Sequence, residues 1–305
     1  MDRYFSYSQY LRKLFGERVF RVTVDAGFTC PNRDGSKGKG GCIYCYAGSD
    51  YDESKRLKSV REQILEGIER VKRRYKAKKF LVYFQAYTNT YAPIEKLKPL
   101  YDIIKEFPEV VGLIVGTRPD CVQDEVLELI NSYTDNYLVW IEYGLESSHF
   151  KSLRWMNRGH GVSDFIDAVL RTRKYTKIKI CAHIILGLPT EDYEDIMETA
   201  DFLASLKIDG VKLHPLHVIK NTPLEKIYLS EKFELLSLEE YVKLVVDFIE
   251  RLPKDTVIQR ITGEAPQDLL IAPSWCSHKE KMKVIELIRK EFEERDTFQG
   301  AKCRF

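Results

Sequence analysis

The sequence lacks long hydrophobic runs and lacks enough cysteine for a disulfide scaffold. It has no stretch of ~18 consecutive apolar residues to span a bilayer, and positions 1–14 are polar and aromatic, without the apolar centre of a signal peptide. Seven cysteines in 305 residues are too few and too unevenly spaced for such a scaffold, and an odd number leaves at least one unpaired. We therefore expect a cytoplasmic protein with no membrane partner, whose cysteines bind a metal ion or cluster.

An excess of charge of one sign is also lacking. Lysine and arginine total 48 against 46 aspartates and glutamates, a formal net charge of +2. This balance says little about partners, because charge acts locally. The basic run 72–79 is the one dense block; it is either a solvated helix end, where cations favour the dipole, or a phosphate-binding surface. Its cations are Lys72, Arg73, Arg74, Lys76, Lys78 and Lys79.

Short apolar runs alternate with amphipathic helical patterns, which predicts a parallel sheet with crossover helices. Several runs are apolar at nearly every position, as strands buried on both faces are. Capping-box pairs Ser59/Glu62 and Ser237/Glu240 mark two helix starts, and a further helix is expected over 279–295. With no repeat or linker, we expect one α/β barrel-like domain, 1–305, with a C-terminal extension. Its six strands are expected at 19–24, 80–84, 110–115, 137–143, 178–186 and 210–213.

A glycine-rich loop after the first expected strand carries three cysteines, Cys30, Cys42 and Cys45, in a C-x11-C-x2-C pattern. Its glycines allow positive φ angles and close approach to an inorganic group. Thiolate ligands select zinc or iron–sulfur clusters. A zinc site would usually need a fourth ligand, from a histidine or another cysteine, and none lies at a short spacing from the three. Three cysteines without an obvious fourth favour a [4Fe–4S] cluster with one open iron, with zinc as the alternative.

The loop, with Tyr44 directly before its third cysteine, resembles that of radical S-adenosylmethionine (SAM) enzymes, especially the branch containing the Elongator catalytic subunit. The whole chain is similar to a small bacterial subfamily labelled YhcC or YtqA, through segments 30–35, 83–91 and 214–217. This resemblance implies a partial (β/α)6 TIM-like barrel with a core at about 18–220 and an extension at about 221–305.

The resemblance also implies a mechanism. The three cysteines would hold a [4Fe–4S] cluster whose fourth iron binds SAM, and an electron from an external donor such as flavodoxin or ferredoxin would start cleavage to a 5′-deoxyadenosyl radical. Cofactor contacts are expected at the C-terminal ends of the strands, as in barrel enzymes. The candidates for them are Tyr44, Gln85, Glu142, Arg158, His183 and Gly187.

Each cofactor candidate has an alternative. Glu142 sits in an apolar strand, where a lone carboxylate is costly to bury, so it either meets ribose hydroxyls or forms a structural salt bridge. Arg158 either meets the cofactor carboxylate or is a solvated loop residue. His183 stands where relatives carry an aspartate toward the ribose, or is a core histidine. Gln85 either stands where the family has a Gly-Gly-Glu-like segment that meets the methionine amine, or belongs to a polar loop at a strand end. Gly187 begins a Gly-Leu-Pro turn expected to pass the adenine.

His214, His217 and Arg260 are the candidate substrate residues, since each follows or ends a late apolar segment; ordinary loop residues are the alternative. The Elongator resemblance points to a wobble uridine of tRNA, or its C5 side chain, as substrate. Two other functions stay open: a radical SAM enzyme acting on a small metabolite, and a zinc-stabilised nucleic-acid-binding protein without catalysis.

Overall fold

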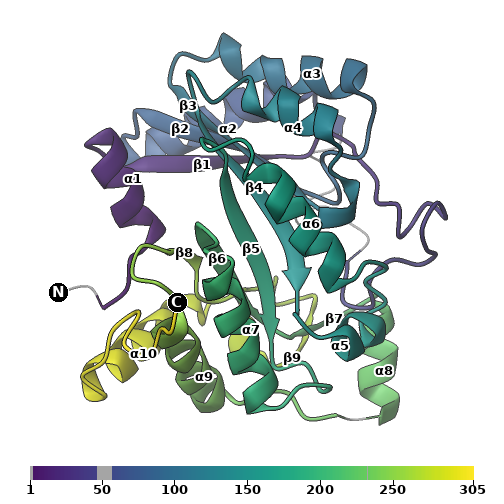
Figure 1. Ribbon diagram of the computed structural model, residues 1–305, viewed down its shortest axis with the longest axis vertical. Helices are drawn as coiled ribbons and strands as arrows, with labels where there is room; N and C mark the ends of the chain where they lie inside the picture. The colour runs from purple at the N-terminus through teal and green to yellow at the C-terminus, as the bar shows by residue number, and fades with distance from the viewer. Residues whose placement is uncertain (1–2, 47–56, 232) are drawn as a thin grey trace.

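A computed structural model describes residues 3–46, 57–231 and 233–305. Seven parallel strands form one curled sheet in the order β1-β2-β3-β4-β5-β6-β8 (Figure 1). The strands are β1 (Val19–Val24), β2 (Lys79–Phe84), β3 (Val110–Thr117), β4 (Leu138–Glu146), β5 (Lys179–Leu186), β6 (Gly210–Pro215) and β8 (Val257–Arg260). The two short strands β7 (Val218–Ile219) and β9 (Leu270–Ala272) pair antiparallel beside it.

Helices connect the strands and cover the outer face of the curl (Figure 1). They are α1 (Tyr7–Phe15), α2 (Val60–Tyr75), α3 (Ile94–Asp102), α4 (Asp124–Asn131), α5 (Phe150–Trp155), α6 (Val162–Thr172), α7 (Tyr193–Ser205), α8 (Pro223–Glu231), α9 (Leu238–Arg251) and α10 (Lys281–Glu294). Across the described residues, no helix is long and apolar enough to cross a membrane.

Successive residues of each strand point to opposite faces of the sheet, and the two faces differ. On β4 the outer face belongs to the main hydrophobic core shared with the helices, through Val139, Ile141, Tyr143 and Leu145. The alternate positions Trp140 and Glu142 face the inside of the curl. The side chains on the inner face therefore line the inside of the half-barrel.

Helix α1 packs against the N-terminal end of the half-barrel. Tyr7 and Leu11 on α1 form a second core cluster with Leu81, Trp140 and Val257 from the inner face. A capping box between Ser6 and Gln9 starts this helix. Beside this packing, a cavity of about 710 Å³ lies between α1 and the starts of the strands. In barrel enzymes the site lies at the opposite end, where the strands terminate.

The α/β fold class is confirmed, and all six expected strands are present. The capping boxes at Ser59 and Ser237 begin α2 and α9 as predicted, and α10 occupies the helix expected over 279–295. The strand β8 was not among the predicted strands. It lies in the predicted C-terminal extension and pairs parallel with β6, so this extension contributes the seventh strand of the sheet.

Candidate active site

A cavity of about 320 Å³ opens at the C-terminal ends of the strands. Its wall comes from the loops after β1 and β2, from the inner faces of β3 to β6, and from the end of β8. All the predicted site residues line it except Gly187 and His217. The former lies in a separate hollow beside α7 and α9, and the latter lines an adjoining cavity of about 190 Å³ together with Tyr44, His183 and His214.

The cysteine loop folds onto the cavity through tight local contacts. Asn32 donates from Nδ2 to the Asn157 carbonyl at 2.6 Å and lies 3.6 Å from the Cys42 sulfur. A Cβ at Gly38 would lie 2.2 Å from Asn32 Oδ1, so only glycine fits there without a shift. Arg33 donates to the Cys45 carbonyl at 3.0 Å. The loop is thus pinned to the chain segment after α5.

Cys30, Cys42 and Cys45 are free thiols, and all three line the cavity. Burial raises the pKa of the Cys45 thiol to about 11, and the neighbouring Cys42 adds to this while Arg33 opposes it. The Cys45 thiol is therefore hard to ionise by itself, whereas a bound metal centre deprotonates its thiol ligands outright.

The number of thiol ligands fits a cluster better than zinc. A structural zinc site usually takes four protein ligands. Three thiolates are enough for a [4Fe–4S] cluster with one open iron, because each thiolate binds a different iron. No other cysteine lines the cavity, so no fourth thiolate is supplied.

Arg158 connects the cysteine loop to β4 and is 7% exposed. It donates to Cys42 Sγ at 3.4 Å and to the Gly144 carbonyl at 2.7 Å, and lies 3.6 Å from Glu146 Oε1. A Cβ at Gly144 would lie 2.4 Å from the guanidinium, so the glycine makes room for it. Its Nε has no hydrogen-bond partner. Arg158 is therefore no solvated loop residue.

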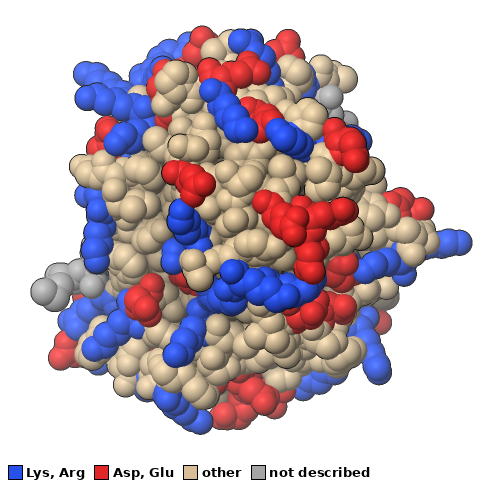
Figure 2. Space-filling view, turned by 45° about the horizontal axis from the view of Figure 1, so that its top comes forward, with Lys and Arg blue, Asp and Glu red and all other residues tan. Residues whose placement is uncertain are grey.

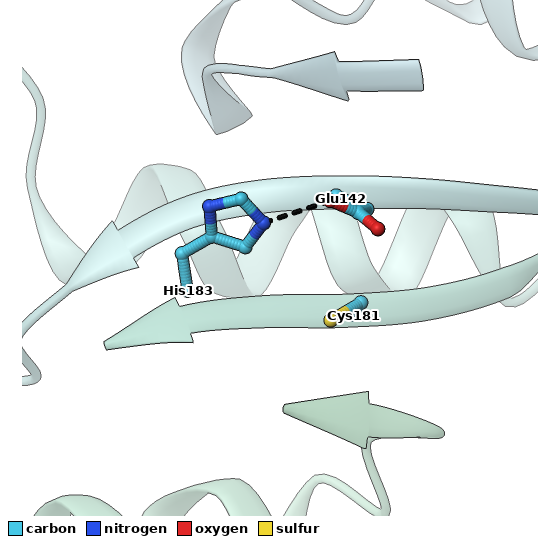
Figure 3. A group of neighbouring side chains, drawn as sticks. All are labelled: Glu142, Cys181 and His183. Atoms are coloured by element: carbon cyan, nitrogen blue, oxygen red, sulfur yellow. Dashed lines mark hydrogen bonds and ion pairs between the residues drawn. The ribbon is translucent and has the colours of Figure 1, made fainter. Parts of the chain in front are cut away.

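Glu142 is fully buried and has a partner, as its place in an apolar strand predicted. Its Oε2 accepts a hydrogen bond from the Lys212 ammonium and lies 2.9 Å from His183 Nε2 (Figure 3). Its Oε1 is buried with no hydrogen-bond partner. Burial would raise the pKa of this carboxyl, but Lys212 and His183 outweigh it and hold the pKa well below its usual range. One oxygen is thus in a salt bridge and the other is free.

Lys212 was missed by the sequence analysis. It lies on β6, is 1% exposed, and its ammonium sits 3.3 Å from the Tyr83 hydroxyl and 4.4 Å from the ring centre. Burial lowers its pKa to about 8. The signal was available, because a lysine inside the apolar run 210–213 raises the same question of a partner that Glu142 raised.

Figure 3 shows Glu142, Cys181 and His183 on neighbouring strands, with ligand atoms close enough to hold a metal ion. The Lys212 ammonium already neutralises the carboxylate. Cys181 is fully buried and does not line the cavity, and burial raises its pKa well above the usual value. We interpret this group as a buried ion-pair network.

The segment after β2 brings further polar groups to the cavity. Gln85 lines it beside Ala86 and Tyr87, which have φ angles of +105° and +59°. Such left-handed conformations are costly for non-glycine residues and concentrate at functional sites. Thr88 Oγ1 and Asn89 Oδ1 line the same wall and are buried without hydrogen-bond partners. The segment offers a ligand several unpaired polar atoms.

The basic run 72–79 lies away from this cavity. It spans the end of α2 and the start of β2, at the N-terminal edge of the sheet. Lys72 is paired with Glu109 at 2.5 Å, and Arg74 lies 5.1 Å from the ring centre of Tyr75. On the face in Figure 2, cationic and anionic side chains are interspersed. A ligand that touched both places would have to span the six residues of β2, about 20 Å.

Comparisons with known proteins show the family of this chain. A family model described as the Radical SAM superfamily matches residues 30–203, and a Radical_SAM C-terminal domain matches 208–294. The uncharacterised protein YtqA of Bacillus subtilis is 39% identical over 299 residues, which are 98% of this chain and 92% of that protein. The tRNA uridine(34) acetyltransferase of Methanocaldococcus jannaschii is 26% identical over 202 residues, 64% of this chain and 34% of that protein.

A solved structure shares the fold. The archaeal Elp3 of Methanocaldococcus infernus superposes with a TM-score of 0.67 at 20% identity, covering 92% of this chain and 64% of that chain. The predicted family resemblance is therefore confirmed.

Proposed function

The chain belongs to the radical SAM superfamily of enzymes, whose cofactors are a [4Fe–4S] cluster and SAM, and on that premise we propose that it binds the cluster through Cys30, Cys42 and Cys45 and modifies a wobble uridine of tRNA. When bound, the two cofactors together supply a carbon-centred radical that takes a hydrogen atom from the substrate. Membership of this family leaves no place for the zinc-stabilised, non-catalytic alternative.

One observation carries the cluster assignment: three free thiols and the buried Arg158 guanidinium meet at one cavity at the C-terminal ends of the strands. Asn32 and Arg158 both lie within hydrogen-bonding reach of Cys42 Sγ, and such contacts stabilise a thiolate over a thiol. Nearby charge and hydrogen bonds also tune a cluster's potential. We therefore assign Asn32 and Arg158 the role of positioning the Cys42 ligand, and no part in the reaction itself.

For SAM we propose two contacts. The unpartnered Nε of Arg158 and its neighbouring nitrogens suit the carboxylate of the methionine moiety, because a guanidinium binds carboxylates through a planar fork. The free Oε1 of Glu142 suits the ribose hydroxyls, since an ionised carboxylate is an acceptor only. In this arrangement Lys212 keeps Glu142 ionised and held against the wall.

An external reductant such as flavodoxin or ferredoxin completes the proposal, because a radical SAM enzyme must receive an electron from outside. The tRNA substrate is supported by the relative that bears the name tRNA uridine(34) acetyltransferase. This chain spans only 34% of that relative, so acetyl transfer is no part of the proposal. Only a large ligand could contact both the cavity and the basic run 72–79, about 20 Å apart along β2, and tRNA is large enough.

The test compares tRNA nucleosides from cells with and without the gene, by mass spectrometry. We expect one modified uridine to disappear and its precursor to accumulate, with rescue by the parent gene and not by a Cys42→Ala variant. A matched Cys121→Ala variant should rescue fully. An unchanged nucleoside profile would contradict the tRNA substrate and favour the small-metabolite alternative.

A further inference from the structure

A row of inward-facing residues crosses four strands at one level of the cavity wall. Strand pairing places Gly144 opposite His183, His183 opposite Lys212, and Lys212 opposite Arg260. All four residues line the cavity. The row begins at the glycine that admits Arg158 and ends at Arg260 on β8, the last strand in the sheet order that begins with β1.

Arg260 differs from every other cation of the cavity wall, because it alone has no partner among the described residues. Its guanidinium makes no hydrogen bond or ion pair there, although it is only partly exposed. The other cations are satisfied: Arg118 by Asp120 at 2.9 Å, Arg158 by Cys42 and Glu146, Lys212 by Glu142, and Arg33 by the Cys45 carbonyl.

The groups around Arg260 add no negative charge. His214 follows Lys212 by two residues on β6, so both point to the same face of the sheet. Burial lowers the pKa of His214 well below the usual value, and the charge of Arg260 is the second largest cause. His214 is therefore neutral near pH 7. Glu142 is already engaged by Lys212. This corner of the cavity is thus cationic, and a partly buried cation without a partner is costly unless a ligand neutralises it.

We propose that Arg260, with His214 beside it, binds an anionic group of the substrate, a carboxylate or a phosphate. Guanidinium groups bind both through paired hydrogen bonds, and the neutral His214 can donate one more. The assignment rests on the proposed function in taking this cavity as the place where substrate meets SAM. It names the substrate as one that carries a negative charge close to the reacting carbon.

The methionine carboxylate of SAM is a different anion and has its own candidate partner. Arg158 contacts the cysteine loop, whereas Arg260 stands on the edge strand at the opposite end of the sheet order. The test must therefore be made with the SAM site filled. It uses the holoprotein, with its cluster reconstituted anaerobically and SAM at saturation.

Inorganic phosphate and acetate are the first probes, each exchanged against chloride at constant ionic strength. A ligand that binds the folded and not the unfolded protein raises the unfolding temperature, by an amount that grows with the logarithm of its concentration above Kd. We expect the parent to be stabilised, Arg260→Gln to bind roughly ten- to a hundredfold more weakly, as for loss of a charge-assisted hydrogen bond, and Arg260→Lys to lie between. Arg12→Gln, which removes an exposed arginine of α1, should match the parent.

Equal stabilisation of parent and Arg260→Gln, or no stabilisation of the parent by either anion, would overturn the anion site. Affinity for SAM should be the same in parent and Arg260→Gln; a loss of SAM binding in the variant would also overturn it, because Arg260 would then serve the cofactor. If Arg260→Gln does not fold, the graded response of Arg260→Lys decides the matter.

Calorimetry with matched uridines then separates the source of the anion and tests the substrate independently. One pair is 5-carboxymethyluridine and its uncharged methyl ester, and the other is uridine 5′-monophosphate and uridine. Tighter binding of 5-carboxymethyluridine than of its methyl ester would place the anion on the base. Tighter binding of uridine 5′-monophosphate than of uridine would place it on the phosphate backbone. Binding of small anions without binding of any uridine keeps the anion site and removes the tRNA proposal.

Discussion

The two faces of the seven-stranded sheet are built from the same strands and follow different rules. The outer face is apolar at every central position and packs under helices, as Val139, Ile141 and Tyr143 do on β4. The inner face holds aromatic and charged groups, among them Glu142 and Lys212, which are both buried. Packing determines the outer face, and the chemistry of the cavity determines the inner one.

The buried charges of the inner face lower the free energy of unfolding, and the apolar packing of the outer face raises it. A buried ion pair is seldom more stable than apolar residues of the same volume, because both ions lose their hydration. The pair Glu142 and Lys212 is therefore weak evidence for a stabilising role and stronger evidence for a functional one. Substitutions on the two faces should separate these contributions.

The largest effect is expected for cluster content, when a cysteine of the cavity wall is replaced. Cys42→Ala should abolish the intact cluster, because the cavity offers no spare thiol to replace it. Cys121→Ala should keep full cluster content, since Cys121 lies outside the cavity wall. Iron and sulfide analysis after anaerobic reconstitution measures both. Full cluster content in Cys42→Ala would refute the assignment of the three ligands.

The next largest effect concerns the buried ion pair. Lys212→Met should lower the free energy of unfolding by about 3–5 kcal/mol, because it leaves the Glu142 charge buried without its cation. On the outer face, Ile141→Val should cost only about 0.5–1.5 kcal/mol. Denaturant unfolding measures both values.

The double variant Glu142→Gln with Lys212→Met sharpens this comparison. It removes both charges, so it should regain most of the stability lost in Lys212→Met. A double variant less stable than Lys212→Met would show that the pair stabilises the fold by more than mutual neutralisation, and would break the contrast between the two faces.

A smaller effect is expected for cofactor binding. Arg158→Ala should weaken SAM binding by about 1.5–3 kcal/mol, the usual value of a hydrogen bond to a charged group. Ile141→Val should leave SAM affinity unchanged, because its side chain faces away from the cavity. Calorimetry with cluster-loaded protein measures both. Unchanged affinity in Arg158→Ala, with the cluster intact, would remove Arg158 from the SAM site.

The sequence predicted the outer face well and the inner face in part. Six strands were visible because most of their positions are apolar. By contrast, β8 has only Val257 and Ile258 as apolar residues, and its strand conformation depends on pairing with β6. Such context decides strand formation more than local preference does. The segment 30–45 was predicted to bind a cluster because its three cysteines lie close together in the sequence.

Residues that act through distant neighbours were harder to predict. The partner of Lys212 could not be named from the sequence, because Glu142 lies 70 positions away. Gly187 was expected to pass the adenine from its resemblance to the family's Gly-Leu-Pro turn, and the structure places it in a separate hollow beside α7 and α9. Neither the pairing nor this position is encoded in local spacing.

The smallest expected effect is a pH dependence that belongs to the inner face alone. Burial lowers the pKa of Lys212 from 10.5 to about 8. Between these values the unfolded chain holds a proton that the folded chain has released, so the unfolded state binds more protons. The free energy of unfolding contributed by this group therefore rises with pH across that window, by at most ~1.4 kcal/mol per pH unit for one proton.

Lys212→Met removes this titration and should remove the rise. Denaturant unfolding of the parent and Lys212→Met at several pH values from 8 upward gives the difference, in which the titration of groups distant from Lys212 cancels. Ile141→Val, with an intact Lys212, should keep the parent's slope. Equal slopes in the parent and Lys212→Met would mean that Lys212 titrates near its ordinary value, and that the inner wall is more hydrated than its burial indicates.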